Sequence, residues 1–430
     1  MSVFTRSRKR TILGAVALAG ASALVLAGCS GGGGDTGGDS SAEPSAAAPG
    51  EELALKIGTA LPQTGNLAFL GPPEEAGVGY AASQINEVSD ETGLSIDVVY
   101  GDSGDTDNKA YETEIPRLLG EDVAAIIGAA SSGTSLQFID QVVGAGVIQF
   151  SPANTSDAFT SYDDNGLYFR TAPSDVLQGE VLGNLIAEDG NQTLGMIVLN
   201  DSYGTGLAGY VTEAFEAAGG EVVAAPTYNT GDTNFDAQIS EVLAADPDAI
   251  ALITFEEVTT ILPGLLGSFP ADKLYFVDGN LSDFSDDGLE PGALTGAKGT
   301  LPGLSIDSIG DFTASLDEWV AAEGLPELTE YSYAAESFDA VVLLALASLA
   351  AGSTDSAAIA ENLITVSGGD GDGEKCTSYA ECADIILGGG TADYDGISGP
   401  ITFDEVGDPT EASIGIYQYG EDNTYSAYEG

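Results

Sequence analysis

Two segments rich in small hydroxyl-bearing residues are the first places where this sequence could do chemistry. One reads Gly-Ala-Ala-Ser-Ser-Gly-Thr over residues 128–134, and the other reads Ser-Pro-Ala-Asn-Thr-Ser over residues 151–156. Each follows a short apolar run and leads toward the next element. Hydroxyl and backbone N–H groups at the start of a helix can hold a carboxylate. Plain helix capping explains the same residues about as well, so both interpretations stay open.

A complementary set of side chains follows three later apolar runs. Asn-Asp-Ser-Tyr-Gly occupies residues 200–204, Phe255 precedes two glutamates, and Asp278 comes directly after residues 274–277. In open α/β sheets, ligands bind beyond the carboxyl ends of the strands. Hydroxyls on one side, with aromatic rings and a carboxylate on the other, would suit a zwitterion that carries a carboxylate and an ammonium.

The elements that must position these side chains alternate between strand-like and helix-like patterns. In the first series we predict strands at residues 53–60, 95–100, 123–127 and 147–150, and helices at 74–88, 107–119 and 135–143. After residue 173 the cycle restarts, with strands at 193–199, 221–225, 249–255 and 274–277, and helices at 174–187, 206–218, 234–244 and 258–266. Short apolar strands between helices predict an α/β fold with two doubly wound parallel sheets.

The remainder of the chain is less regular. Residues 334–351 predict a strongly apolar helix, which we expect to be buried because Glu336 and Asp339 interrupt it and the uncharged part is too short to span a bilayer. Asp105 or Thr106 is a plausible N-cap for the helix at 107–119. Late strands are predicted at 401–403 and 412–417.

The N-terminus carries an export signal. Four basic residues precede an uncharged apolar stretch that ends at Leu26-Ala27-Gly28-Cys29, which resembles a bacterial lipobox. We therefore expect a signal peptide at 1–28, lipid on Cys29, a flexible tether at 29–52, and a location outside the cytoplasm on the cell membrane. An ordinary signal peptide and a short membrane anchor are the alternatives.

The charge of the chain excludes several functions. There are 68 Asp and Glu residues against 11 Lys and Arg, and there is no histidine, so the formal net charge is −57. Nucleic acid is a poor partner because phosphate binding needs clustered basic residues. A catalytic triad with a histidine base is excluded.

Two cysteines remain besides Cys29. Cys376 and Cys382 lie six positions apart, and outside the cytoplasm such a pair predicts a small-loop disulfide. Acidic residues nearby fall on an EF-hand-like register, but Lys375 stands where the sharp turn needs glycine. We therefore expect no metal.

Several motifs, in this order and spacing, resemble branched-chain amino-acid-type substrate-binding proteins. They are Leu-Lys-Ile-Gly at 55–58, Leu-Pro-Gln-Thr-Gly at 61–65, the two hydroxyl-rich loops, residues 200–206, and Gly-Pro-Ile-Thr-Phe-Asp at 399–404. The resemblance implies a type I periplasmic-binding fold with three hinge crossovers near 172, 302 and 392. The N-terminal lobe would comprise 53–172 and 302–391, and the C-terminal lobe 173–301 and 392–430.

The same resemblance implies roles for individual residues. Ser132, assisted by Thr155, would bind a ligand carboxylate, and Asp278 would pair with an ammonium. Further residues carried over to the pocket are Ser131, Ala153 (through its carbonyl), Asn154, Tyr203, Phe255 and Leu70. Asp278 is shorter than the glutamate of leucine-binding members, and Leu70 and Asn154 also depart from the family, so side-chain specificity stays open.

The function that the resemblance implies is capture of an amino acid or small carboxylate for an ABC importer. The protein would be a lipid-anchored monomer without a cofactor or enzymatic activity, and its partners would be the ligand and the permease subunits. A ligand sensor, or a binder of an amide, urea or an aromatic acid, is the alternative on the same fold. An exported hydrolase that uses paired carboxylates is a third hypothesis.

Overall fold

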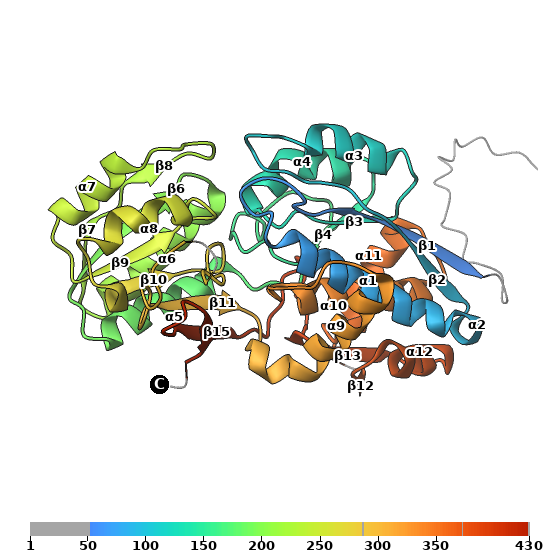
Figure 1. Cartoon of the computed structure of the whole chain (residues 1–430). Coiled ribbons are helices and arrows are strands. Elements are labelled where there is room, and N and C mark those ends of the chain that lie inside the picture. Colours follow the sequence, from blue (N-terminus) through green and yellow to red (C-terminus); the bar gives the residue numbers. More distant parts are fainter. Residues whose placement is uncertain (1–51, 286–287, 372, 429–430) are drawn as a thin grey trace, which may run out of the picture. The chain divides into compact units, whose positions relative to one another are not determined.

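The computed structural model describes residues 52–285, 288–371 and 373–428. The predicted signal peptide, Cys29 and nearly all of the predicted tether lie outside these residues. All described residues belong to one compact unit, in which helices and strands alternate (Figure 1). The first strand begins at Leu53, where the polar segment gives way to an apolar run.

The first sheet has five parallel strands in the order β2-β1-β3-β4-β5. Its central strands β3 and β4 are buried along their whole length, as expected for a parallel sheet with helices on both faces. We call this sheet and the elements packed on it the first lobe. The strands are β1 (Leu53–Ala60), β2 (Leu94–Val99), β3 (Ala125–Gly128), β4 (Ile148–Ser151) and β5 (Tyr168–Arg170), and the early helices are α1 (Gly71–Glu87), α2 (Ser89–Thr92), α3 (Tyr111–Leu119) and α4 (Ser132–Gly144).

A later part of the chain returns to the first lobe. Helix α10 (Ala334–Ala351) packs beside α1 (Figure 1), and most of its residues are buried in the same core. The prediction of a buried helix is therefore confirmed. The other late elements are η2 (Ile306–Ile309), α9 (Gly310–Glu323), α11 (Ser356–Val366), β12 (Glu374–Cys376), α12 (Tyr379–Leu387), β13 (Ala392–Gly396) and β14 (Gly399–Pro400).

The second sheet follows the order β16-β15-β11-β10-β9-β6-β7, with β8 beside β6. Strands β6 to β11 run parallel to one another, and β15 and β16 add an antiparallel edge beside β11. We call this sheet and its helices the second lobe. Its strands are β6 (Thr193–Leu199), β7 (Glu221–Ala224), β8 (Thr227–Tyr228), β9 (Ala249–Ile253), β10 (Leu274–Phe276), β11 (Lys298–Pro302), β15 (Ile414–Tyr419) and β16 (Tyr425–Ala427), and its helices are α5 (Asp175–Glu188), α6 (Ser202–Ala217), α7 (Asp236–Ala244), α8 (Val258–Leu266) and η1 (Ala271–Lys273).

The chain crosses between the two sheets three times, and the crossings are bonded to one another. The first follows β5, the second follows β11, and the third lies between Phe403 of the first core and β15. Arg170 N–H, at the first crossing, donates to the carbonyl of Gly407 in the third, and Gly303 N–H, at the second crossing, donates to the carbonyl of Ser413 in the third. We propose that the third boundary lies after residue 408 rather than at 392, because Tyr394 also belongs to the first core.

Two local predictions were wrong. Helix α3 begins at Tyr111, because the Asp105 carboxylate accepts hydrogen bonds from the N–H groups of Asp107 and Asn108 and holds that segment in a turn. Residues 401–403 form no strand, and only an isolated bridge joins Phe403 to Pro409. Strands β5 and β11 and helices α9, α11 and α12 were not predicted.

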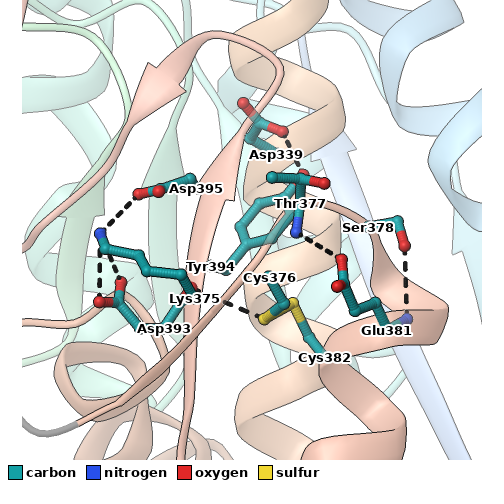
Figure 2. Close-up of a disulfide and its surroundings, with 10 residues drawn as sticks. All are labelled: Asp339, Lys375, Cys376, Thr377, Ser378, Glu381, Cys382, Asp393, Tyr394 and Asp395. Atoms are coloured by element: carbon teal, nitrogen blue, oxygen red, sulfur yellow. Dashed lines mark hydrogen bonds and ion pairs between the residues drawn. A yellow bond between two sulfur atoms is a disulfide. The ribbon is translucent and has the colours of Figure 1, made fainter.

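The predicted disulfide between Cys376 and Cys382 is present and lies at the start of α12 (Figure 2). Both cysteines are buried in the first core. Lys375, beside the disulfide, forms ion pairs with Asp393 and Asp395 at 3.1 and 2.8 Å. The bond therefore closes a short loop within the first lobe.

Candidate ligand-binding site

A small cavity lies between the carboxyl-end loops of the two sheets. It has about 250 Å³ of empty volume, counting the space open to solvent. Little free space remains between its lining residues, so a ligand would enter only as the two lobes move apart. Its lining residues are Leu67, Leu70, Ala130, Ser131, Ser132, Ala153, Thr155, Tyr203, Phe255, Asp278, Gly279 and Tyr333.

The start of α4 builds the hydroxyl wall of this cavity. The Ser131 hydroxyl caps the helix by accepting from the N–H of Thr134 at 3.2 Å. The Ser132 oxygen accepts from the N–H groups of Thr155 and Ser156, at 3.3 and 3.2 Å. Both lone pairs of Ser132 are then engaged, so its hydroxyl proton remains free to be donated.

Thr155 brings a second hydroxyl to the same wall. Its side-chain oxygen is buried and makes no hydrogen bond of acceptable geometry among the described residues. Burial and the charge of Asp278 raise the pKa of the nearby Asp175 carboxyl well above its usual value. The Thr155 hydroxyl lowers that pKa by less. A carboxylate in the cavity would therefore compete with Asp175 for the proton of the Thr155 hydroxyl.

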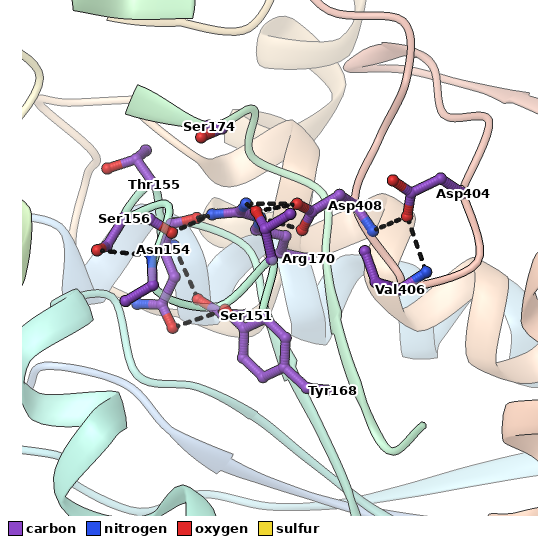
Figure 3. A network of polar contacts seen from close by, with 12 residues as sticks. Ser151, Asn154, Thr155, Ser156, Tyr168, Arg170, Ser174, Asp404, Val406 and Asp408 are labelled. Atoms are coloured by element: carbon purple, nitrogen blue, oxygen red, sulfur yellow. Dashed lines mark hydrogen bonds and ion pairs between the residues drawn. The ribbon is translucent and has the colours of Figure 1, made fainter. Parts of the chain in front are cut away.

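Asn154 faces away from the cavity, although the sequence placed it among the ligand-binding residues. Its amide nitrogen donates to the carbonyls of Ala129 and Ala130, at 2.9 and 2.8 Å. Its amide oxygen accepts from the hydroxyl of Tyr168 at 3.0 Å (Figure 3). The side chain therefore ties the two hydroxyl-rich loops together from behind.

The second lobe supplies an aromatic wall. Tyr203 lies in the first turn of α6, where the Asp201 carboxylate caps the helix by accepting from the N–H of Gly204 at 2.7 Å. The rings of Tyr203 and Phe255 stack with their centroids 5.2 Å apart. Together they close the cavity on the side opposite to Ser132.

Asp278 places a carboxylate in the cavity immediately after β10. Its Oδ1 accepts from Gln178 Nε2 and the Tyr203 hydroxyl, at 2.9 and 2.7 Å, and its Oδ2 accepts from the Tyr333 hydroxyl at 2.8 Å. Burial raises the pKa of Asp278, while these three donors oppose the rise by stabilising the charged form. No Lys or Arg is among the described residues that line the cavity.

Tyr333 is the main residue that the sequence analysis missed. It has a left-handed backbone (φ 61°) immediately before α10, and its hydroxyl reaches Asp278 of the second lobe. Nothing in the sequence marks a tyrosine at the start of an apolar helix as part of a site. Leu67, Ala130 and Gly279 were also missed, although each is a close neighbour of a predicted residue.

Hydrogen bonds join the two lobes around the cavity. Asn66 Nδ2 donates to the Glu257 carboxylate at 3.0 Å, and the carbonyl of Asn66 accepts from the N–H of Glu256 at 3.2 Å. Elsewhere the Ser156 hydroxyl donates to the carbonyl of Ser202 at 3.3 Å. The segment that carries Leu67 and Leu70 is thus held over the cavity.

A larger groove lies beside the cavity and has about 2020 Å³ of empty volume, counting the space open to solvent. Four aromatic residues line it, namely Phe69, Tyr100, Phe284 and Trp319. It lacks the paired hydroxyls and the carboxylate at a strand end that the smaller cavity combines. We therefore place the candidate site in the smaller cavity.

Most of the chain matches a known protein family. Residues 54–379 match the sequence pattern of a family described as periplasmic binding protein. The match covers most of the first lobe and all of the second sheet except β15 and β16.

Curated relatives cover different shares of the chain. A leucine-, isoleucine-, valine-, threonine- and alanine-binding protein of Pseudomonas aeruginosa is 31% identical over 44% of this chain and 51% of its own length. The chain spans about half the length of the first curated relatives that it matches. BasB of Halobacterium salinarum, a substrate-binding protein of a chemotactic signal transduction system, is 24% identical over 81% of this chain and 83% of its own length.

Solved structures show the same fold at low identity. LivJ from Streptococcus pneumoniae, the substrate-binding protein of a branched-chain amino acid transporter, was solved with isoleucine; it is 21% identical, with a TM-score of 0.69 over 87% of this chain and 99% of that one. A solute-binding protein from Rhodopseudomonas palustris, solved with benzoate, is 19% identical, with a TM-score of 0.66 over 87% of this chain and 95% of that one. Both have the type I periplasmic-binding fold with two parallel-sheet lobes, which confirms the predicted fold class.

Proposed function

Because the chain belongs to the periplasmic binding protein family, whose members bind solutes and are not enzymes, we propose that it captures an α-amino acid with an apolar side chain outside the cytoplasm. One observation carries the proposal: a small cavity presents two hydroxyls on one wall and a buried carboxylate on the other. An α-amino acid carries the complementary pair of charges.

The hydroxyl wall suits the ligand carboxylate. Ser132 has a proton to donate, and the buried Thr155 hydroxyl makes no hydrogen bond of acceptable geometry within the described part of the chain. Hydrogen bonds to a charged group contribute about 1.5–3 kcal/mol each. The carbonyl of Ala153, which also lines the cavity, would accept from the ligand ammonium.

The carboxylate of Asp278 favours an amino acid over an acid that has no amino group. Asp175 lies close enough for the charge of Asp278 to raise its pKa, and the more distant Arg170 lowers that pKa by less, so acidic groups dominate this side of the cavity. A ligand that carries only a carboxylate, such as benzoate, would bring a third acid into that field. An ammonium would instead compensate the charge of Asp278.

The apolar part of the ligand would contact Leu67, Leu70 and Phe255. All three are almost fully buried, so an aliphatic side chain would gain dispersion contacts with them rather than bury much additional surface. Closure of the two lobes would be driven by ligand, because only the closed form lets both walls contact it. Delivery to an ABC permease, with lipid on Cys29 holding the protein at the membrane, completes the proposal.

Sensing is the second candidate for the same site. The chemotactic relative from Halobacterium salinarum matches more of this chain than the amino-acid-binding relative from Pseudomonas aeruginosa does. In that case the closed form would dock on a membrane receptor instead of a permease. The mature protein can be reconstituted in vesicles with a candidate permease or with a candidate membrane receptor. Uptake of ligand into the vesicles would favour transport, and ligand-dependent binding to the receptor would favour sensing.

Calorimetry with matched ligands tests the proposal. Leucine should bind, whereas 4-methylpentanoate, which lacks the ammonium, and leucinamide, which lacks the carboxylate, should each bind much more weakly. Benzoate should behave like 4-methylpentanoate. Equal affinity for leucine and 4-methylpentanoate would remove the role of Asp278, and absence of binding to any amino acid would overturn the proposed ligand class.

A further inference from the structure

Arg170 lies behind the loop that carries Thr155, at the last position of β5 (Figure 3). Its side chain is fully buried, and each of its five N–H groups has an acceptor. Nε and Nη2 bind the two carboxylate oxygens of Asp408 at 2.6 and 2.7 Å. Nη2 also donates to the hydroxyl of Thr160 at 3.1 Å, and that hydroxyl donates to Asp408 at 2.6 Å.

The remaining two N–H groups of Arg170 bracket Thr155. Nη1 donates to the carbonyls of Asn154 and Ser156, at 3.3 and 2.8 Å. The N–H of Thr155 binds the Ser132 oxygen, and its carbonyl accepts from the N–H of Asp175 at 2.7 Å. The backbone on both sides of Thr155 is therefore fixed, while its hydroxyl is left for a ligand.

Asp408 connects this loop to the third crossing. It closes a turn in which its N–H donates to the Asp404 carboxylate and its carbonyl accepts from the N–H of Asp404, at 3.0 and 2.9 Å. The carbonyl of Gly407 accepts from the N–H of Arg170 at 3.2 Å. Beyond this turn the chain continues to β15 of the second sheet.

Stability alone does not explain a charge pair in this position. The desolvation of two buried charges often cancels their attraction, so apolar residues of similar volume can be as stable. Arg170 offers something that an apolar residue cannot, namely five directed hydrogen bonds, two of which hold the backbone on either side of Thr155.

We propose that Arg170 and Asp408 are positioning residues of the ligand site: they hold Thr155 in place for the ligand carboxylate and tie it to the third crossing. This inference rests on the proposed function, because it assigns the loop to binding of a carboxylate. It assigns this role to two residues that lie 238 positions apart in the sequence and do not line the cavity.

Calorimetry with leucine tests the pair against a matched control. Asp408→Asn and Arg170→Lys should weaken leucine binding by about tenfold or more, because small misplacements of a binding group are costly. Lys298 and Asp189 form a comparable pair in the second lobe, at 2.6 Å and away from the cavity. Asp189→Asn should lower the melting temperature and leave leucine binding unchanged. Equal losses of affinity in both pairs, or no loss in Asp408→Asn, would overturn the proposal.

Amide hydrogen exchange tests the same pair without any ligand. The N–H groups of Thr155 and Ser156 should exchange faster in Asp408→Asn than in the wild type, and at the wild-type rate in Asp189→Asn. If the protein binds no amino acid, the proposed function fails while this measurement still decides the positioning role. Thr160→Val, which removes only the bridging hydroxyl, should give a smaller increase in a folded protein. Unchanged exchange in both first-lobe variants would contradict the proposal.

Discussion

The two walls of the cavity are built in different ways. On the first wall, Ser132 and Thr155 present small hydroxyls whose backbone is fixed by other residues, among them the buried guanidinium of Arg170. On the second wall, Asp278 presents a charge directly, held by side chains from α5, α6 and the residue before α10. A neutral hydroxyl donates one short hydrogen bond, so it must be placed accurately by the residues around it. A carboxylate attracts an ammonium over a longer range, so its exact position matters less than its charge.

The largest effect is expected on the second wall. Asp278→Asn should cost about 2–5 kcal/mol of leucine binding, because the ligand ammonium would be buried without its counter-charge. The same variant should bind 4-methylpentanoate no more weakly than the wild type does. Isothermal titration of both ligands checks this, and a parallel loss for both would mean that the variant damages the cavity in general.

A smaller loss is expected on the first wall. Thr155→Val should cost about 1.5–3 kcal/mol of leucine binding, since one hydrogen bond to the carboxylate is lost. Thr134→Val is the matched control, because the Thr134 hydroxyl is also buried without a partner but does not line the cavity. If leucinamide loses as much affinity as leucine, Thr155 does not read the carboxylate.

Glu336 lies where the crossings meet, and it is expected to affect stability more than binding. Burial raises its pKa from 4.5 to about 8, and the neighbouring Asp339 adds to the rise. The folded state therefore holds the proton more tightly, so the wild type should lose stability as the pH rises from 4.5 through about 8. The Glu336→Gln variant has no carboxyl to titrate at this position, so its free energy of unfolding should fall less over the same pH range. Chemical denaturation across this pH range checks it, and parallel profiles for the two proteins would contradict it.

The disulfide should have the smallest effect on affinity. Replacing Cys376 and Cys382 with serine should lower the free energy of unfolding by about 2 kcal/mol, because the closed loop is short. Leucine affinity should stay unchanged, since both residues lie in the first core and away from the cavity. A change in affinity would show that the first wall depends on distant parts of its lobe.

The sequence predicted those parts of the site that follow directly from strand ends. Thr155 and Asp278 come just after short apolar runs, and parallel strands bring such positions to one edge. It could not predict Tyr333 or the pairing of Arg170 with Asp408, because both depend on how distant segments return to the first lobe. The orientation of Asn154 was missed for a similar reason: a polar residue in a binding loop can serve the loop itself.

Helices and strands were predicted best where the apolar pattern of the sequence was not opposed by local side-chain hydrogen bonds. The strand at Thr193–Leu199 and the helix at Ala334–Ala351 were predicted with the bounds that the structure has, since their apolar patterns agree with their burial. The start of α3 was wrong because hydrogen bonds to the Asp105 side chain competed with the helix. Strand β5 was missed because it has only three residues.

The chain has a single tryptophan, and its position has a spectroscopic consequence. Trp319 lines the larger groove together with residues of both lobes, and its indole N–H has no hydrogen-bond partner among the described residues. Water that enters this groove as the lobes separate would solvate the indole and shift its fluorescence to longer wavelength. The protein therefore carries its own optical reporter of opening and closing, with no label and no competing indole.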